Sequence, residues 1–190
     1  MESIYSEVEA EKFVKHYPDV TRALALRTYT SRLMGADPNL VLHGGGNTSV
    51  KVRQKNIIGE EQEVLFVKGS GVDLVDIEPD DFVALDLAFL RKLRTLESLE
   101  DEEMESQMQI HKLHTSPLNP SVEALLHAFL PHRYVDHTHA DSVLVLTNQP
   151  EGPDLIHRPN TKITVSWRPL SLLTTGFSPL PRMQKHHTSE

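Results

Sequence analysis

The sequence predicts one domain of the α/β or α+β class, built around a mixed or antiparallel sheet. Two observations support this class: segments with helical periodicity alternate with strand-like segments, and two of the strands are joined as in a β-hairpin. Of the 190 residues, 38% are hydrophobic and 24% are charged, so the chain has enough apolar material for one sizeable core.

The first elements are a helix and a short strand. Residues 18–34 carry apolar side chains near helical spacing, and Gly35 ends this helix. A turn at Asp37-Pro38 leads to a short apolar strand expected at residues 40–42. That strand runs into the glycine-rich segment His43-Gly44-Gly45-Gly46-Asn47.

The hairpin comes next. Residues 49–53 alternate as a strand does, and residues 63–67 form the returning strand after a polar loop at residues 56–62. A second glycine-rich loop, Lys68-Gly69-Ser70-Gly71, follows, and residues 82–87 are expected to form another strand.

The rest of the domain is expected to hold an acidic segment, a helix, a buried strand and a further helix. The acidic segment is interpreted as a solvated loop or the exposed face of a helix. The helix has candidate capping residues and a proline in its first turn. The acidic segment covers residues 97–109. The helix begins at Asn119 or Ser121, with Pro120 near its start, and runs to about Leu130. The strand is expected at residues 134–139 and the further helix at residues 140–147.

Composition excludes several classes of protein. The formal net charge is -8 and no Lys/Arg cluster stands out, so nucleic-acid binding is not expected. No apolar run approaches the roughly 20 residues of a membrane helix, and the acidic start is not a signal peptide, so we expect a cytoplasmic protein. Without cysteine, any zinc site must use His and carboxylate ligands.

A change in charge marks a boundary near Glu151. Residues 1–150 hold 24 acidic and 14 basic side chains, whereas residues 151–190 hold 3 and 5, together with 5 of the 12 prolines. We therefore predict a domain over residues 1–150, followed by an atypical tail over residues 151–190.

The strongest chemical signal is the pair His137 and His139. On a strand, residues i and i+2 project to the same face, so the two imidazoles can converge on one ion at about 2.0–2.1 Å. The alternative is two half-buried histidines that hydrogen-bond to the backbone. The spacing alone does not distinguish a metal-binding pair from two such histidines.

Glu123 and the two glycine-rich loops are weaker signals. Glu123 lies near a helix start, where a carboxylate can be a metal ligand, a general base or a partner of the helix dipole. Gly44-Gly45-Gly46-Asn47 and Ser70-Gly71 allow the backbone to approach an anion closely, although such runs are often plain turns. Neither loop has a Walker A or a dinucleotide fingerprint. Beside a metal site, these loops would suggest a phosphorylated or polyhydroxy substrate.

Four ordered segments together resemble the class II aldolase/adducin family. The likeness is strongest to the aldolase part of rhamnulose-1-phosphate aldolase/alcohol dehydrogenase fusions, and it covers roughly residues 20–150. The segments are residues 35–49, residues 66–71, Pro120-Ser121-Val122-Glu123 and His137-Thr138-His139-Ala140-Asp141.

The resemblance implies a three-layer α/β/α fold around a central, mostly antiparallel sheet, and a homotetramer. It implies zinc or another divalent metal held by His137 and His139, with Glu123 as catalytic acid/base and further ligand. It also implies a phosphate site, which would consist of Gly46, Asn47, Ser70, Gly71 and Ser121. Val122 stands where one branch of the family has a second serine.

The function implied is that of a lyase in carbohydrate metabolism. A zinc-dependent aldolase would cleave a small-molecule sugar phosphate, such as rhamnulose 1-phosphate, to dihydroxyacetone phosphate and an aldehyde. The alternatives are an epimerase or dehydratase on a sugar phosphate, and a non-catalytic adducin-like binding domain, which the retained metal residues disfavour.

The family's third histidine ligand has no match. The later histidines are His157, His186 and His187, and none lies in a matching context. We therefore expect that the carboxyl-terminal part of the domain is missing after residue 150, through truncation, a frameshift or an error in the gene model, and that this product is unstable or an inactive fragment by itself. The alternative is a diverged natural terminus.

Overall fold

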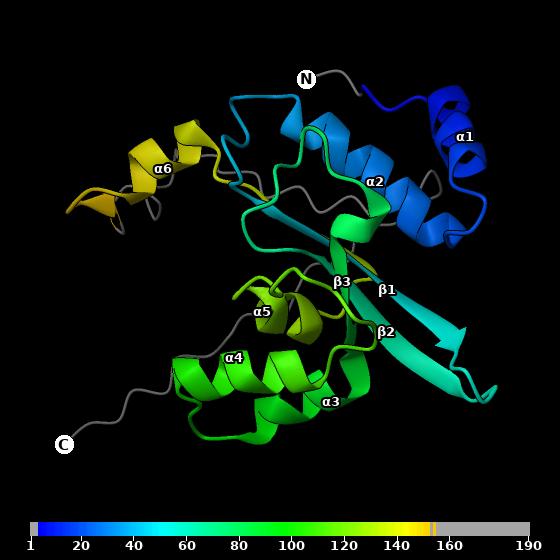
Figure 1. The fold of residues 1–190 in the computed structure, drawn as a ribbon. Helices are drawn as coiled ribbons and strands as arrows, with labels where there is room; N and C mark the ends of the chain where they lie inside the picture. The colour runs from blue at the N-terminus through cyan, green and yellow to red at the C-terminus, as the bar shows by residue number, and fades with distance from the viewer. Residues whose placement is uncertain (1–3, 153, 155–190) are drawn as a thin grey trace, which may run out of the picture.

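Within the described residues, the central sheet has four antiparallel strands in the order β3-β2-β1-β4. The computed structural model describes residues 4–152 and 154. Figure 1 shows helices above and below this sheet, which confirms the predicted α/β class with three layers. The strands are β1 (Asn47–Lys55), β2 (Glu61–Lys68), β3 (Phe82–Asp86) and β4 (Tyr134–His137).

The hairpin of β1 and β2 is the predicted one, with both strands a few residues longer. Its register runs from Ser49↔Val67 to Lys55↔Glu61. The turn closes on Asn56, whose side-chain Oδ1 accepts hydrogen bonds from the N–H groups of Ile58 and Glu60. A short polar side chain that bonds to the backbone two residues on is typical of such turns.

The two faces of the sheet explain why β2 has four consecutive apolar residues, residues 64–67. Val64 and Phe66 pack into one core with α2 (Arg22–Gly35). Leu65 and Val67 pack into a second core with α3, α4 and α5. A strand covered on both faces cannot alternate between apolar and polar residues. The helices of the second face are α3 (Leu87–Lys92), α4 (Asp101–Ile110) and α5 (Ala124–Phe129).

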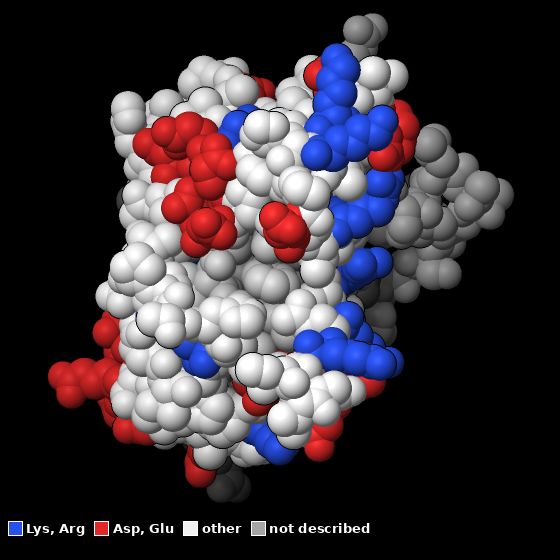
Figure 2. Space-filling model, turned by 45° about the vertical axis from the view of Figure 1, so that its right-hand side comes forward, with Lys and Arg blue, Asp and Glu red and all other residues white. Residues whose placement is uncertain are grey.

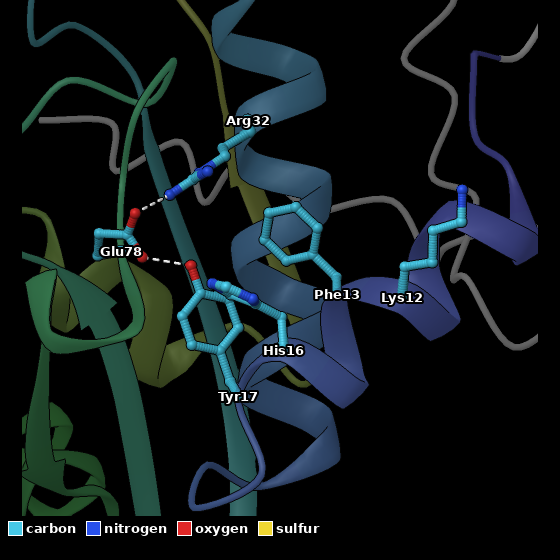
Figure 3. A pocket seen from close by; sticks show the side chains of 6 residues that line it. All are labelled: Lys12, Phe13, His16, Tyr17, Arg32 and Glu78. Atoms are coloured by element: carbon cyan, nitrogen blue, oxygen red, sulfur yellow. Dashed lines mark hydrogen bonds and ion pairs between the residues drawn. The ribbon is translucent and has the colours of Figure 1, made fainter.

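Helix α1 (Glu7–His16), which the sequence analysis did not predict, covers the outer side of α2. Ala10 is its one fully buried residue, and Ala10, Phe13 and Val14 follow helical spacing on the side that is shielded from water, so the sequence did carry a signal for this helix. Side chains of α1, α2 and the segment before η1 surround a cavity of about 320 Å³ and hold α1 against the domain. Figure 3 shows Glu78 accepting hydrogen bonds from both Tyr17 and Arg32, and the Arg32 guanidinium lies 5.2 Å from the centre of the Phe13 ring.

The strand predicted at residues 40–42 is wrong. Residues 38–40 form a turn in which the Asp37 carboxylate accepts a hydrogen bond from the Asn39 N–H, and residues 41–42 are irregular. Leu42 is 53% exposed, and His43 has a φ of 39°, which takes the backbone into the left-handed region. The local turn chemistry therefore outweighs the short apolar run.

Other boundaries also differ. Thr21 caps α2, which therefore starts four residues later than predicted. The acidic segment forms the exposed helix α4, with Met108 buried against the sheet. Helix α5 is shorter than predicted, and β4 ends at His137 rather than at residue 139. Short 3-10 turns occur at η1 (Pro79–Asp81) and η2 (Leu93–Thr95).

Helix α6 (Asp141–Thr147) agrees with the predicted helix and projects away from the sheet in Figure 1. None of its residues is buried.

Most of the predicted tail over residues 151–190, with its three histidines, lies outside the described residues. Within the described part, no helix is both long and apolar enough to span a membrane. Figure 2 shows one face, on which most basic side chains lie along the right-hand edge, and a group of acidic side chains lies at the upper left, with others along the lower margin and beside the basic edge.

Gly35 offers a test of the contact between α2 and the segment before η1. A Cβ atom at Gly35 would lie 2.3 Å from the Val75 nitrogen and 2.4 Å from the Leu74 carbonyl carbon. Because these are backbone atoms, we expect Gly35→Ala to lower the free energy of unfolding by about 2–3 kcal/mol. Gly59→Ala is the control: it meets no atom within 4 Å but has a φ of +86°, so it should cost only about 1 kcal/mol. Urea unfolding measures both, and a wild-type stability of Gly35→Ala would contradict this packing.

Candidate metal centre

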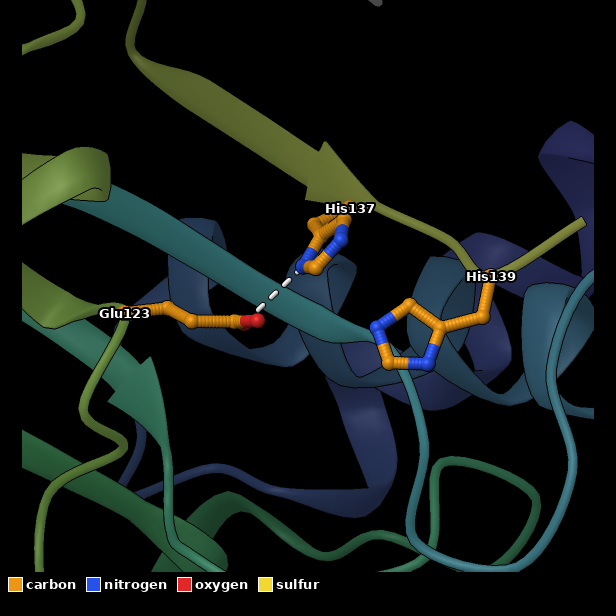
Figure 4. A group of neighbouring side chains, drawn as sticks. All are labelled: Glu123, His137 and His139. Atoms are coloured by element: carbon orange, nitrogen blue, oxygen red, sulfur yellow. Dashed lines mark ion pairs between the residues drawn. The ribbon is translucent and has the colours of Figure 1, made fainter. Parts of the chain in front are cut away.

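Glu123, His137 and His139 come together at one point of the structure. Each offers a ligand atom, and these atoms lie within 4.8 Å of one another. The His137 Nδ1 is 2.9 Å from the Glu123 Oε2, and the two imidazole centres are 4.7 Å apart. Figure 4 shows the three side chains pointing toward a common space. Glu123 and His137 are partly buried, whereas His139 is exposed.

The two histidines reach this point from the end of β4. Pairing of β4 with β1 places His137 opposite Asn47. His139 lies beyond the strand, so the strand geometry behind the sequence prediction holds only for His137. Instead, the His139 N–H donates a 2.9 Å hydrogen bond to the Leu40 carbonyl, which fixes the chain after the strand. The two imidazoles are therefore neighbours, held by a strand and by a loop contact.

Glu123 is presented by the turn that starts α5. The Ser121 hydroxyl accepts a hydrogen bond from the Glu123 N–H, and the Ser121 carbonyl accepts one from Ala124. Burial raises the pKa of the Glu123 carboxyl, but the neighbouring groups, the His137 imidazole above all, outweigh burial. The net pKa is lowered, so this carboxyl is ionised at neutral pH and able to hold a cation or accept a proton.

Several buried polar atoms at this site have no hydrogen-bond partner. They are the His137 Nδ1, the His127 Nε2 and both amide atoms of Asn47. The contact between His137 and Glu123 has the distance of an ion pair but not the geometry of a hydrogen bond. Because buried polar atoms are nearly always bonded, such a cluster indicates a place for a ligand.

The donor set fits a divalent metal. Two imidazoles and one carboxylate are the three protein ligands found in several catalytic zinc sites, where a fourth position stays open. The unpartnered nitrogen of His137, facing an ionised carboxylate, is the observation that best matches such an ion. Glu123, His137 and His139 are therefore the residues that could hold it.

His127 and the pair Arg27–Asp136 support the site from two sides, and sequence reasoning missed them. His127 is fully buried, and its Nδ1 lies 2.8 Å from the Ser49 hydroxyl. Its position four residues after Glu123, one helical turn on, was the available signal. On the other face of the sheet, Arg27 is 1% exposed and its guanidinium lies 2.6 Å from the Asp136 carboxylate. Arg27 thus anchors β4 to α2.

The first glycine-rich loop packs directly on the metal residues. A Cβ atom at Gly45 would lie 3.5 Å from the His139 Nδ1 and 2.8 Å from the Leu42 carbonyl oxygen. At Gly46, where φ is +68°, a Cβ would lie 2.9 Å from the His137 carbonyl oxygen. Both positions therefore require glycine for close approach. Gly45 was not among the predicted site residues, although a Cβ atom there would contact the His139 imidazole.

The second glycine-rich loop lies against the first. A Cβ at Gly44 would lie 3.5 Å from the Gly71 carbonyl oxygen. The Ser70 N–H donates to the Asn119 carbonyl, and Gly69 forms an isolated bridge with Pro120, so this loop also adjoins the segment that carries Ser121. Ser70 and Gly71 are exposed, Ser121 is partly buried, and Asn47 is fully buried. The five predicted phosphate residues thus lie on adjoining segments around Glu123.

Comparison with known proteins agrees with this architecture. The family described as "Class II Aldolase and Adducin N-terminal domain" matches residues 26–169. The "Uncharacterized oxidoreductase YuxG" of Bacillus subtilis (strain 168) is 38% identical over 148 residues, which are 75% of this chain and 22% of that protein. The chain therefore spans about a fifth of the length of this relative.

A solved structure is similar as well. It is described as the structure of the N-terminal class II aldolase domain of a conserved protein from Thermoplasma acidophilum. The TM-score is 0.69 at 35% sequence identity, and the match covers 82% of this chain and 68% of the solved one. The family match over residues 26–169 spans the region that carries Glu123, His137 and His139.

The buried His127 predicts a pH dependence of stability. Burial lowers its pKa to about 4 from an ordinary value of 6.5. The unfolded chain therefore takes up this proton at a higher pH than the folded one. Stability from this group is complete above pH 6.5 and is lost as the pH falls toward 4, by about 3 kcal/mol in all. Urea unfolding of the wild type and His127→Gln at pH 7, 5.5 and 4.5 measures the difference. Equal slopes for the two proteins would contradict the assignment.

Proposed function

This chain belongs to the class II aldolase and adducin family, and from that membership and the geometry of the metal centre we propose that it is a metal-dependent aldolase. Its substrate would be a sugar phosphate such as rhamnulose 1-phosphate, cleaved to dihydroxyacetone phosphate and an aldehyde. The observation that carries the proposal is the convergence of Glu123, His137 and His139 beside two glycine-rich loops.

The chemistry is divided between the metal residues and Glu123. His137 and His139, together with Glu123, would hold zinc or another divalent cation. When bound, this cation would supply the Lewis acidity that polarises a substrate carbonyl. Glu123 is ionised at neutral pH, because its neighbours lower the pKa of its carboxyl. It can therefore accept the proton that a hydroxyl group loses when a neighbouring carbon–carbon bond breaks.

The two glycine-rich loops would bind the phosphate group of the substrate. Gly46, Asn47, Ser70, Gly71 and Ser121 supply backbone N–H groups, hydroxyls and an amide on adjoining segments. Backbone N–H groups in glycine-rich turns form concave sites for anions. The close contact between Gly44 and Gly71 supports one shared anion site rather than two separate turns.

Other activities in the same family would use the same residues. An epimerase or dehydratase acting on a sugar phosphate would need the same metal centre, and a product assay for a triose separates the aldolase from both. An adducin-like binding domain would not need the three ligands. The Bacillus relative is named an oxidoreductase, but neither glycine-rich loop of this chain has a dinucleotide-binding fingerprint.

We further propose that the chain functions as part of a homotetramer in the cytoplasm. Exposed apolar side chains on α6 support an association with further protein, since Val143, Leu144 and Val145 are 40%, 43% and 70% exposed. Apolar patches of this kind often mark interaction sites.

Removal of one imidazole tests the metal role. We expect His137→Ala to lose bound zinc and to lower aldolase activity by more than about 100-fold, because even supporting groups of a metal site are worth up to that factor. Metal analysis of the purified protein and the aldol assay measure the two effects. His114→Ala, at an exposed histidine away from the centre, is the control. Full activity of metal-free His137→Ala would refute the proposal.

Replacement of the carboxylate tests the proton-transfer role. Glu123→Gln keeps the shape of the side chain but cannot accept a proton, so activity should fall by about 10²–10⁴-fold even at saturating zinc. Glu105→Gln, on the exposed face of α4, should retain wild-type activity. If Glu123→Gln recovers wild-type activity when zinc is added in excess, Glu123 serves only as a ligand.

A further inference from the structure

A second cavity, of about 190 Å³, lies between the hairpin, helix α3 and the turn that joins α5 to β4. Four of the side chains that line it are cationic and one is a carboxylate. The chain as a whole has a formal net charge of -8, so this concentration of positive charge is a local feature. The lining residues are Lys51, Val52, Arg53, Glu63, Leu87, Arg91, Pro131 and Arg133.

The pairing of β1 with β4 separates this cavity from the metal centre. The centre lies where Asn47 is opposite His137. The cavity lies four residues further along β1, where the Lys51 N–H donates a hydrogen bond to the Arg133 carbonyl. At about 3.3 Å per residue, the two places are about 13 Å apart along the strand. Neither the candidate metal ligands nor the glycine-rich loops line the cavity, which is therefore a site of its own.

The carboxylate of the cavity does not balance its cations. Glu63 lies 3.2 Å from the Arg53 guanidinium and 3.0 Å from that of Arg91, so one negative charge is shared between two positive groups. In the part of the chain that the structure describes, no carboxylate forms an ion pair with Arg133. Its guanidinium lies 5.5 Å from the centre of the Tyr134 ring. The lining thus keeps a surplus of positive charge.

Lys51 is the buried member of the lining, and its surroundings show the same surplus. Only 7% of its surface is exposed, and its ammonium group donates to the carbonyls of Leu130 and His132. Burial is the main reason why the pKa of Lys51 falls to about 8, and the positive charge of Arg91 acts in the same direction. An ammonium group whose charged neighbour is another cation lies in a positive potential, which a bound anion would relieve.

We propose that this cavity binds a small ligand through a phosphate group, either the free ion or a phosphate ester. A phosphate group carries a charge of about -1.5 to -2 at neutral pH, which matches the surplus better than one carboxylate does. The planar guanidinium groups of Arg53, Arg91 and Arg133 can each donate two parallel hydrogen bonds to such an oxyanion, and Lys51 supplies charge behind it. The site does not depend on the proposed aldolase activity.

Nuclear magnetic resonance of the ¹⁵N-labelled full chain tests the site. The zinc-loaded protein is titrated with inorganic phosphate, with glycerol phosphate and with acetate at constant ionic strength. We expect the amide signals of the cavity residues to shift and to saturate with either phosphate, and acetate to bind at least about tenfold more weakly, because it carries a single charge. Shifts at the glycine-rich loops report separately on the proposed substrate site.

Three arginine variants locate the binding. Arg133→Gln and Arg91→Gln each remove one guanidinium of the cavity, and both side chains are exposed, so the core stays intact. The matched control is Arg22→Gln, since Arg22 also pairs with a glutamate, Glu11, but starts α2 on the other face of the sheet. We expect the phosphate dissociation constant at the cavity to rise by about tenfold or more in the two cavity variants and to stay unchanged in Arg22→Gln.

Several results would overturn the proposal. They are phosphate shifts confined to the glycine-rich loops, acetate binding as tight as phosphate binding, and a loss in Arg22→Gln equal to that in the cavity variants. Tighter binding of glycerol phosphate supports a phosphate ester as the ligand, and tighter binding of inorganic phosphate supports the free ion.

Discussion

Antiparallel pairing between β1 and β4 is the constraint on which the candidate centre depends. Four residue pairs, from Asn47↔His137 to Val50↔Tyr134, align the two strands. Because antiparallel neighbours run in opposite directions, the segment before β1 and the segment after β4 must lie side by side. The first is the glycine-rich loop, and the second carries His139. Without this register, Gly45 and His139 would not meet. The pairing is held from both faces, by the ion pair of Arg27 with Asp136 and by the contact of His127 with Ser49.

Strand β1 buries several polar side chains, which are unfavourable in the core unless they find hydrogen-bond partners. Its neighbour β2 buries a run of apolar side chains, whereas β1 buries Asn47, Thr48, Ser49 and Lys51 as well as two valines. Each buried polar group needs a partner. Thr48 has one in Ser31 of α2, at 2.8 Å, and Ser49 has one in His127. Asn47, at the end nearest the centre, has none, and neither have the free nitrogens of His127 and His137. These three unpartnered groups lie beside the candidate metal ligands, where an ion and a polar substrate would be placed, whereas Arg27, which also has unpartnered nitrogens, lies on the other face of the sheet.

The sequence predicted the parts of the molecule that local patterns encode. The hairpin was predicted from two strand-like segments, the first with alternating apolar residues, on either side of a polar loop. Helix α6 was predicted as the segment that directly follows the strand of the two histidines. The strand at residues 40–42 failed because an Asx turn at Asp37 and a left-handed His43 outweigh three apolar residues. Helix α1 was missed although Ala10, Phe13 and Val14 follow helical spacing, because this segment was interpreted only as a polar, acidic start. Among the site residues, Glu123, His137 and His139 were found through their motifs. His127, Arg27 and Gly45 were not, because their roles depend on contacts between segments distant in sequence.

The central claim is that Glu123, His137 and His139 hold a divalent metal. X-ray absorption spectroscopy of the zinc-loaded protein tests it most directly, since the spectrum reports the identity of the ligand atoms. The account predicts a first shell of nitrogen and oxygen at about 2.0–2.1 Å, with the outer-shell scattering of at least two imidazoles, and loss of one imidazole in the spectrum of a His139 variant. A shell made of oxygen alone, without imidazole scattering, would contradict it.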